Sequence, residues 1–191
     1  MDSLGKENSI SAAKTDLPVV IDIEASGFGR GSYPIEIGLA LADGSPHCFL
    51  IRPLPHWSHW SREAEDIHGI DRDTLLQHGR PAPWVAEQLN RLLAGQTAYT
   101  DAWGNDNSWL GRLYEEVGLG QRYRLETIRR LLSETQAAAW GETRETLRWR
   151  LKARRHRASS DALVLQRTYR SSVLPDSLPE PSAGTAELSQ S

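Results

Sequence analysis

Residues 17–24, LPVVIDIE, place two carboxylates inside a short run of β-branched residues. Such a run, ended by Ser26 and Gly27, predicts a buried β-strand. Successive side chains on a strand alternate between its two faces, so Asp22 and Glu24 leave the same face and can hold the same pair of cations. Because burial of unpaired charge is costly, two acids in such a run indicate a site that neutralises them. The alternative interpretation is a strand end whose acids are solvated.

The rest of the chain predicts an α/β fold with one mixed sheet. Apolar runs at 35–42 and 47–53 are joined through Asp43-Gly44-Ser45-Pro46, and Asp-Gly between two such runs is a strong hairpin signal. The first three strands are therefore expected to form an antiparallel meander, after which helices and short strands alternate. The expected helices cover 61–70, 71–79, 81–95, 105–118, 126–134, 141–156 and 159–170, and the expected later strands cover 96–100 and 122–126.

Length and composition predict one ordered domain. The 191 residues, 39% of them hydrophobic, suffice for one core and are too few for two domains of ordinary size. Residues 1–16 are polar, and residues 171–191 are rich in Ser, Pro, Ala and Glu, so we expect disordered segments on either side of a domain at 17–170. The single cysteine, Cys48, excludes an internal disulfide. Without a secretory signal or an apolar run near the roughly 20 residues that span a bilayer, we expect a cytoplasmic protein that does not contact membranes.

Positive charge is concentrated late in the chain, although the formal net charge is −3. Residues 144–157, RETLRWRLKARRHR, carry seven Arg and Lys against one Glu. A basic face of this kind suits the backbone of a nucleic acid, and acids that hold cations do not repel phosphate as free acids do. Taken alone, the run would better fit the solvated face of a helix.

Two further acids stand near the predicted helix at 105–118. Asp106 falls in its first turn, where an acid complements the helix dipole or caps the helix. Trp109 and Leu110 would bury this helix against the sheet and so fix Asp106 at its edge, near the first strand. Asp101, in the loop before the helix, is the rival for the same role, because it could equally approach the cations.

His156 and Asp161 form a His-x4-Asp pattern that crosses a loop into the last predicted helix. An imidazole at the edge of a site can leave and return, and so can take a proton from water, while an acid on a helix stays fixed. The alternative for a histidine after a run of arginines is a surface residue. Together with Asp22, Glu24 and Asp106, the pair indicates divalent cations gathered around a phosphodiester.

In this order, the motifs DIEASG, GNDNSWL and HRASSDA resemble the three exonuclease motifs of the DnaQ-like 3′→5′ exonucleases, the DEDD superfamily. A histidine five residues before Asp161, with Arg and not Tyr at position 157, is similar to the histidine subclass, DEDDh. YPIEIGLAL is similar to the second strand of the family, and DIHGIDRDTL to its His-Gly-Ile segment. The resemblance spans about residues 17–170. It implies an RNase H-like fold, with a mixed five-stranded sheet flanked by helices.

The resemblance also implies roles for individual residues. The metal ligands, which would bind two Mg²⁺ or Mn²⁺ ions, would be Asp22, Glu24, Asp106 and Asp161. His156 would be the general base. One ion would activate water, the other would stabilise the leaving 3′ oxygen, and both would balance charge on the phosphate. The family commonly has an aromatic residue before its second-motif aspartate, where this chain has Asn105, so Asp106 and Asp101 remain alternatives at that position.

Four residues match family positions that contact the substrate. Ser26 and Gly27 follow the first motif, and their small size lets the backbone approach the terminal nucleotide. The family usually has Thr in this segment, so Ala25 and Ser26 are a departure. His68 and Glu63 match positions near the terminal nucleotide in proofreading relatives.

The segment PHWSHW offers His56 and His59 with aromatic residues between them, as in a zinc half-site or a base-stacking platform. No Cys or acidic residue at ligand spacing completes a zinc set. We therefore expect a loop whose tryptophans pack on the core. Stacking of Trp57 or Trp60 on an unpaired base is the alternative.

The expected function is a metal-dependent 3′→5′ exonuclease that releases nucleoside 5′-monophosphates. Single-stranded DNA is the expected substrate, because the last nucleotide must be splayed into the site. An oligoribonuclease or RNA-trimming enzyme is an alternative, since the same acids serve RNA and DNA. A proofreading or nucleic-acid-binding subunit that acts with a polymerase partner is a further alternative, with residues 171–191 as a docking segment. A homodimer also stays open.

Overall fold

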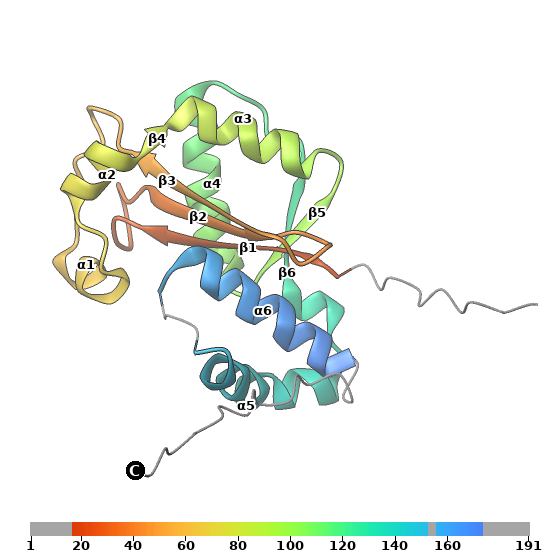
Figure 1. The fold of residues 1–191 in the computed structure, drawn as a ribbon. Helices are drawn as coiled ribbons and strands as arrows, with labels where there is room; N and C mark the ends of the chain where they lie inside the picture. The colour runs from red at the N-terminus through yellow and green to blue at the C-terminus, as the bar shows by residue number, and fades with distance from the viewer. Residues whose placement is uncertain (1–16, 153–155, 174–191) are drawn as a thin grey trace, which may run out of the picture.

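A mixed sheet of six strands forms the centre of the computed structural model, which describes residues 17–152 and 156–173 (Figure 1). The strands are β1 (Val19–Ala25), β2 (Pro34–Ala40), β3 (Pro46–Arg52), β4 (Arg80–Pro81), β5 (Thr97–Thr100) and β6 (Arg124–Thr127), in the order β4-β3-β2-β1-β5-β6. The first three form the predicted antiparallel meander, whereas β5 lies parallel to β1 and β6 parallel to β5. The predicted mixed sheet is confirmed. It gains a sixth strand, β4, because a two-residue edge pairing leaves no recognisable pattern in the sequence.

Side-chain caps explain where several helices begin. The helices are α1 (Arg62–His68), α2 (Arg72–His78), α3 (Ala82–Leu93), α4 (Trp103–Val117), the 3-10 helix η1 (Ile128–Leu131), α5 (Glu134–Arg150) and α6 (Ala158–Val173). Ser61 accepts a hydrogen bond from the backbone of Ala64 at the start of α1. Ser133 and Gln136 form a capping box, so α5 begins earlier than the predicted residue 141. None of the helices in the described part of the chain is long and apolar enough to cross a membrane.

The predicted bounds of two further helices are wrong. The helix expected at 126–134 is reduced to η1, because Thr127 still belongs to β6 and Ser133 already caps α5. The last helix begins at Ala158, before the serines expected to cap it, and its continuation to Val173 makes residues 171–173 helical. The segments 1–16 and 174–191, for which disorder was predicted, lie outside the described residues.

Helices cover both faces of the sheet (Figure 1). One face carries α3 and α4, the other carries α5 and α6, and α1 and α2 lie at one end. Successive side chains of β1 point alternately to the two faces of the sheet. Ile21 and Ile23 belong to the main hydrophobic core with α3 and α4, whereas Val20 packs in a second core with Leu165 of α6. Asp22 and Glu24 therefore leave β1 on the same face as Val20, toward α6.

The first turn of α6 lies directly against β2. A Cβ at Gly38 of β2 would stand 2.0 Å from the carbonyl carbon of Ala158 and 2.1 Å from the nitrogen of Ser159. Only glycine leaves room for this approach. This close contact holds the first turn of α6 against the sheet. Asp161, on that turn, therefore lies beside the face from which Asp22 and Glu24 project.

Candidate active site

A cleft of about 410 Å³ lies where β1, α1, α4, α5 and the start of α6 meet. Its lining includes all five residues that the sequence proposes as catalytic, which are Asp22, Glu24, Asp106, His156 and Asp161. Two of the four proposed substrate residues, Gly27 and His68, line it as well, and so does Asp101. The structure thus brings residues from five separate segments of the chain to one place.

Glu24, His156 and Asp161 come closest together. Each offers a ligand atom, and these atoms all lie within 4.8 Å of one another. Glu24 comes from β1, Asp161 from the first turn of α6, and His156 from the turn between α5 and α6. Within the described ranges this is the one group of three or more His, Cys, Asp and Glu side chains with spacing suited to a metal ion.

The acids of the cleft perturb one another strongly. Burial raises the pKa of Asp22 well above its ordinary value, and the neighbouring Asp106 and Glu24 add to this. Burial also raises the pKa of Glu24 to about 7, with a further contribution from Asp161. The pKa of Asp106 is raised to about 7, because burial outweighs the hydrogen bond from Thr100. Without a compensating cation, the cluster therefore retains protons near neutral pH.

Asp106 and Asp101 differ in their surroundings. Asp106 lies in the first turn of α4, is 1% exposed, and accepts a hydrogen bond from the hydroxyl of Thr100 at the end of β5. Asp101 is more exposed and forms an ion pair with Arg144, with 2.6 Å between Oδ2 and Nη1. Both line the cleft, but Asp106 is fixed on a helix and contributes to the raised pKa of both Asp22 and Glu24.

The donor set of the cleft fits a divalent cation. Carboxylate oxygens are the ligands that Mg²⁺ and Mn²⁺ prefer. Asp161 Oδ1 is buried and makes no well-aligned hydrogen bond within the described residues, although Arg148 Nη2 lies 3.0 Å away as an ion-pair partner. A cation would also offset the mutual repulsion that raises the pKa values of these acids.

The histidines of PHWSHW serve other contacts. His56 Nε2 lies 2.7 Å from Glu116 of α4, and His59 Nδ1 lies 3.0 Å from the hydroxyl of Ser26. Trp57 is completely buried and stacks on Tyr33, as expected for a loop whose tryptophans pack on the core. Both histidines thus have partners within the fold.

Arg157 connects the turn that carries His156 to the sheet. Its guanidinium donates to the carboxylate of Glu36 from Nη2 at 2.6 Å and from Nε at 3.0 Å, and the Ala158 N–H donates to the same carboxylate at 2.8 Å. Burial raises the pKa of the fully buried Glu36, but these hydrogen bonds outweigh it and hold the pKa below its ordinary value. His156 itself has a φ of 56°, which is unusual for a residue other than glycine. The ion pair thus anchors the residues that follow His156.

Glu36 was not predicted as part of the site, although the sequence held a signal for it. It is a single acid within the apolar run at 35–42, and it lies directly across from Glu24 in the pairing of β1 with β2. Two like charges opposite each other destabilise a sheet unless one is neutralised. Arg157 supplies that neutralisation. Only the tertiary structure reveals the partner, because it is distant in sequence.

Of the two residues that follow the first motif, Gly27 lines the cleft and Ser26 does not. Gly27 lines the cleft with a φ of 142°, and a Cβ on it would lie 2.7 Å from both the ring of His59 and the Cβ of Ser61. Ser26 is 1% exposed and accepts a hydrogen bond from the Tyr33 N–H at 3.1 Å. The hydroxyl of Ser26 therefore holds the loop together and is not among the groups that line the cleft.

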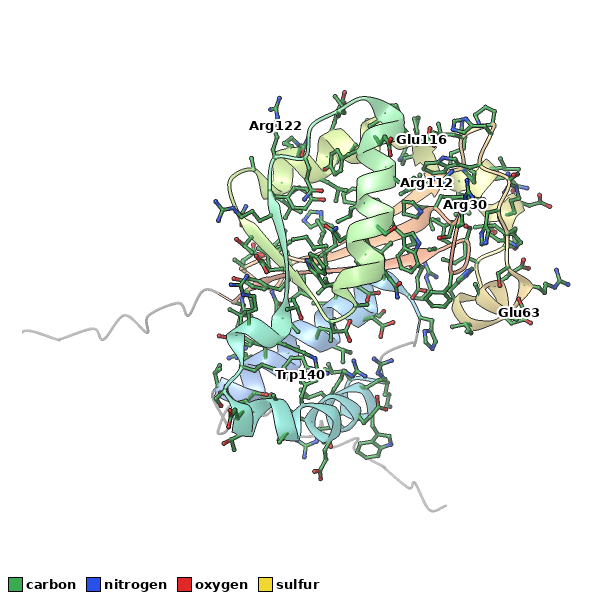
Figure 2. All side chains as sticks on the ribbon, turned by 180° about the vertical axis from the view of Figure 1, so that it is seen from behind. Arg30, Glu63, Arg112, Glu116, Arg122 and Trp140 are labelled. Atoms are coloured by element: carbon green, nitrogen blue, oxygen red, sulfur yellow. The ribbon has the colours of Figure 1, made fainter. Side chains whose placement is uncertain are left out.

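His68 and Glu63 both lie on α1, but only His68 reaches the cleft. It is 4% exposed, and its Nδ1 accepts a hydrogen bond from the Ile70 N–H at 3.0 Å. Burial lowers the pKa of His68, which favours a neutral ring with its proton on Nε2. Nε2 makes no well-aligned hydrogen bond within the described residues. Glu63 is exposed, accepts from Ser61, and lies at the periphery of the molecule (Figure 2), so its predicted contact with substrate finds no support in this geometry.

Phe28, Arg144 and Arg148 also line the cleft, and none of them was proposed as a site residue from the sequence. Phe28 is 69% exposed and packs one side of its ring near Trp109, at 5.9 Å between centroids. Arg144 and Arg148 extend from α5 to cleft acids. The basic run at 144–157 predicted a positively charged face. The sequence alone did not show whether Arg144 and Arg148 point toward the cleft or toward solvent.

No protein-family model and no curated protein sequence matches the chain. Structures of exonuclease I are similar to it. The E. coli enzyme in complex with a dA16 oligonucleotide has a TM-score of 0.63 at 13% identity, over 84% of this chain and 42% of that protein. The zinc-bound form of its complex with single-stranded DNA has a TM-score of 0.60 at 13% identity, over 84% of this chain and 41% of that one.

Another structure of exonuclease I has a TM-score of 0.61 at 14% identity, over 84% of this chain and 42% of that one. The chain therefore spans less than half the length of the proteins it matches. At this identity the likeness concerns the arrangement of the strands and helices. The chain has the predicted RNase H-like fold, which it shares with E. coli exonuclease I.

Proposed function

We propose that this protein is a metal-dependent 3′→5′ exonuclease that removes nucleoside 5′-monophosphates from single-stranded DNA. The observation that carries the proposal is the convergence of Glu24, His156 and Asp161 within 4.8 Å, in a cleft that Asp22 and Asp106 also line. The likeness in fold to exonuclease I bound to single-stranded DNA supports it. Those complexes also favour DNA over RNA as the substrate.

Four carboxylates would hold the divalent ions, Mg²⁺ or Mn²⁺, and they are Asp22, Glu24, Asp106 and Asp161. When bound, two such ions supply a more acidic water and charge stabilisation of the phosphate and the leaving oxygen. The raised pKa values of Asp22, Glu24 and Asp106 support this assignment, because acids that repel one another gain most from a shared cation.

His156 is assigned as the general base. Its imidazole is exposed at the cleft and lies beside the carboxylates of Glu24 and Asp161, where it can take a proton from the attacking water. The water oxygen forms a bond to phosphorus as the bond from phosphorus to the 3′ oxygen breaks. The neighbouring carboxylates stabilise the imidazolium that results. The Glu36–Arg157 ion pair keeps the turn of His156 in place.

Gly27, His68 and Phe28 would form the contacts with the terminal nucleotide. The cleft volume of about 410 Å³ lies within the range of small-ligand sites. Gly27 lines the cleft and would offer its backbone to the nucleotide, and the Nε2–H of a neutral His68 would be a donor for a sugar or phosphate oxygen. The exposed ring of Phe28 offers a surface on which a base can stack. Ser26 would not contact the nucleotide, but its hydrogen bond with Tyr33 would hold the loop that contains Gly27.

The direct test is incubation of the full chain with end-labelled oligomers of DNA and RNA, single and double stranded, in Mg²⁺, Mn²⁺ or EDTA. We expect a ladder that shortens from the 3′ end of single-stranded DNA and disappears in EDTA. His156→Ala should suppress turnover while it retains binding of metal and of DNA. Failure to cleave any oligomer with either metal would refute the proposal.

A further inference from the structure

Two arginines of α5 face the candidate active site. Arg144 and Arg148 stand four residues apart, so they share one face of the helix, and both line the cleft. The side chain of Arg148 is 14% exposed and that of Arg144 is 31% exposed. Arg150, near the end of the same helix, is exposed and does not line the cleft.

Each of the two arginines is paired with an acid of the cleft. Arg144 Nη1 lies 2.6 Å from Asp101 Oδ2, and Arg148 Nη2 lies 3.0 Å from Asp161 Oδ1. The second contact is close but poorly aligned, since Asp161 Oδ1 makes no hydrogen bond within the described residues. Arg148 is therefore held to Asp161 mainly by charge.

Both guanidinium groups also have unused donors. Nε of Arg144 and Nε of Arg148 are buried and have no hydrogen-bond partner in the part of the chain that the structure describes. Glu145 Oε1 lies 3.8 Å from Nε of Arg148, beyond hydrogen-bond distance. A buried donor without an acceptor costs about 1–3 kcal/mol. Two such donors on one wall of a cleft indicate an acceptor that comes from a ligand.

We propose that Arg144 and Arg148 form a clamp for a phosphate of the nucleic-acid backbone, and that Arg148 exchanges Asp161 for this phosphate when a divalent cation binds the carboxylate. The inference rests on the proposed function, because it takes the phosphodiester backbone as the ligand. It assigns substrate-binding residues on α5, a helix that carries none of the predicted catalytic groups.

The chemistry of the groups supports the exchange. A guanidinium and a divalent cation compete for the same oxygen of Asp161, and a cation with two charges displaces the weaker partner. The released guanidinium presents a planar fork that matches two phosphate oxygens. When Arg148 leaves Asp161 it loses a negatively charged partner, and a phosphate that enters the cleft replaces that partner. The arrangement thus keeps the cleft near charge balance both before and after the substrate binds.

The affinity of the protein for single-stranded DNA tests whether Arg144 and Arg148 bind a phosphate. Variants are made in a His156→Ala background to suppress turnover, and a fluorescein-labelled single-stranded DNA is titrated in Mn²⁺ at several salt concentrations. Arg148→Gln should weaken binding by about tenfold, as expected for the loss of a charge-assisted contact. The slope of log Kd against log salt should fall by about one for each phosphate contact removed. Arg144→Gln should act in the same direction.

Binding of Mn²⁺ alone, measured by calorimetry without DNA, separates the exchange from a structural role. Arg148→Gln should bind Mn²⁺ more tightly, because a competitor for Asp161 is removed. Arg144→Gln should leave Mn²⁺ affinity unchanged, since its partner Asp101 is outside the proposed ligand set. A merely structural Arg148 would instead lose affinity for Mn²⁺ and DNA together. Arg148→Lys keeps the charge without the fork and should bind DNA with intermediate affinity.

Arg150→Gln is the matched control, since it removes the same charge from the same helix outside the cleft. It should change DNA affinity by no more than about twofold. If wild-type protein cleaves DNA but Arg148→Gln binds it as Arg150→Gln does, the clamp is wrong and the proposed function stands. The clamp is equally wrong if Arg148→Gln weakens Mn²⁺ binding. If the wild-type protein neither binds nor cleaves DNA in Mn²⁺, the proposed function is wrong and the clamp with it.

Discussion

Asp106 and Asp101 show how two neighbouring acids in one cleft acquire different chemistry. The helix holds Asp106 at 1% exposure with Thr100 as its donor, whereas Asp101 is already neutralised by Arg144. We predict that Asp106→Asn lowers turnover of single-stranded DNA by at least about a thousandfold, which corresponds to several kcal/mol of transition-state stabilisation. Asp101→Asn should lower it by less than about tenfold.

Rate measurements under saturating Mn²⁺ and DNA check this assignment, with Asp43→Asn in the β2–β3 turn as a control outside the cleft. The sequence left the two acids as alternatives, because the residue before Asp106 departs from the family pattern. If Asp101→Asn proves as damaging as Asp22→Asn while Asp106→Asn stays active, Asp101 is the ligand.

The raised pKa values predict how the metal-free protein responds to pH. Asp106 has an ordinary pKa of 3.8 and a folded pKa of about 7, and Glu24 goes from 4.5 to about 7. Between these values the folded state binds protons that the unfolded state releases. Proton binding by these two acids therefore stabilises the folded state fully below their ordinary pKa values. This stabilisation is lost as pH rises through their folded pKa of about 7. In EDTA, we expect Tm to fall from about pH 5 to about pH 8 by on the order of 5–10 °C.

Thermal unfolding of the wild type and of Asp106→Asn in EDTA separates this effect from other titrations. The variant lacks one of the groups, so its Tm should depend less on pH over the same interval. Saturating Mn²⁺ should reverse the trend, because the ion favours the ionised carboxylates. Identical pH profiles of the two proteins in EDTA would contradict the assignment.

At the level of elements, the site depends on the contact of α6 with β2. Gly38→Ala would put a Cβ 2.0 Å from the backbone of Ala158, and no side-chain rotation relieves a clash with backbone. We predict a loss of about 3 kcal/mol in the free energy of unfolding, at the upper end for overpacking. Turnover should also fall, because Asp161 moves away from Glu24 with the helix.

Gly111→Ala on α4 is the matched control, because a Cβ there meets nothing within 4 Å. In the interior of a helix this change is expected to stabilise the protein by up to about 1 kcal/mol. Denaturant unfolding and turnover of both variants provide the comparison. Equal stability of the two variants would show that α6 does not need the close approach at Gly38.

The elements that the sequence predicts well are those with local causes. The meander follows from apolar runs and an Asp-Gly turn, and the period of β1 fixes the common face of Asp22 and Glu24. The start of α5 and the brevity of η1 depend on competition between caps, which the pattern of apolar residues does not reveal. Glu36 pairs with Arg157 across 121 residues, and Asp161 of α6 pairs with Arg148 of the preceding helix. Only the packed structure reveals these two pairings.

At the scale of the whole molecule, the fold assembles the cleft from segments spread over the described chain. β1 supplies Asp22 and Glu24, α4 supplies Asp106, and the turn into α6 supplies His156 and Asp161. The two hydrophobic cores on either side of the sheet hold these segments in place. Because no segment carries the whole set, activity and folding should be lost together when either core is disrupted.

The proposed function requires that this cleft hydrolyse DNA from its 3′ end. The most direct measurement follows a 5′-labelled single-stranded DNA with Mn²⁺ and identifies the released product by mass spectrometry, for the wild type and for Glu24→Gln. Glu24→Gln keeps the shape of the side chain but removes the charge that faces Asp161. We predict that the wild type releases nucleoside 5′-monophosphates one at a time from the 3′ end, and that Glu24→Gln or EDTA stops the release. Intact DNA after incubation with the wild type, or equal release by Glu24→Gln, would contradict it.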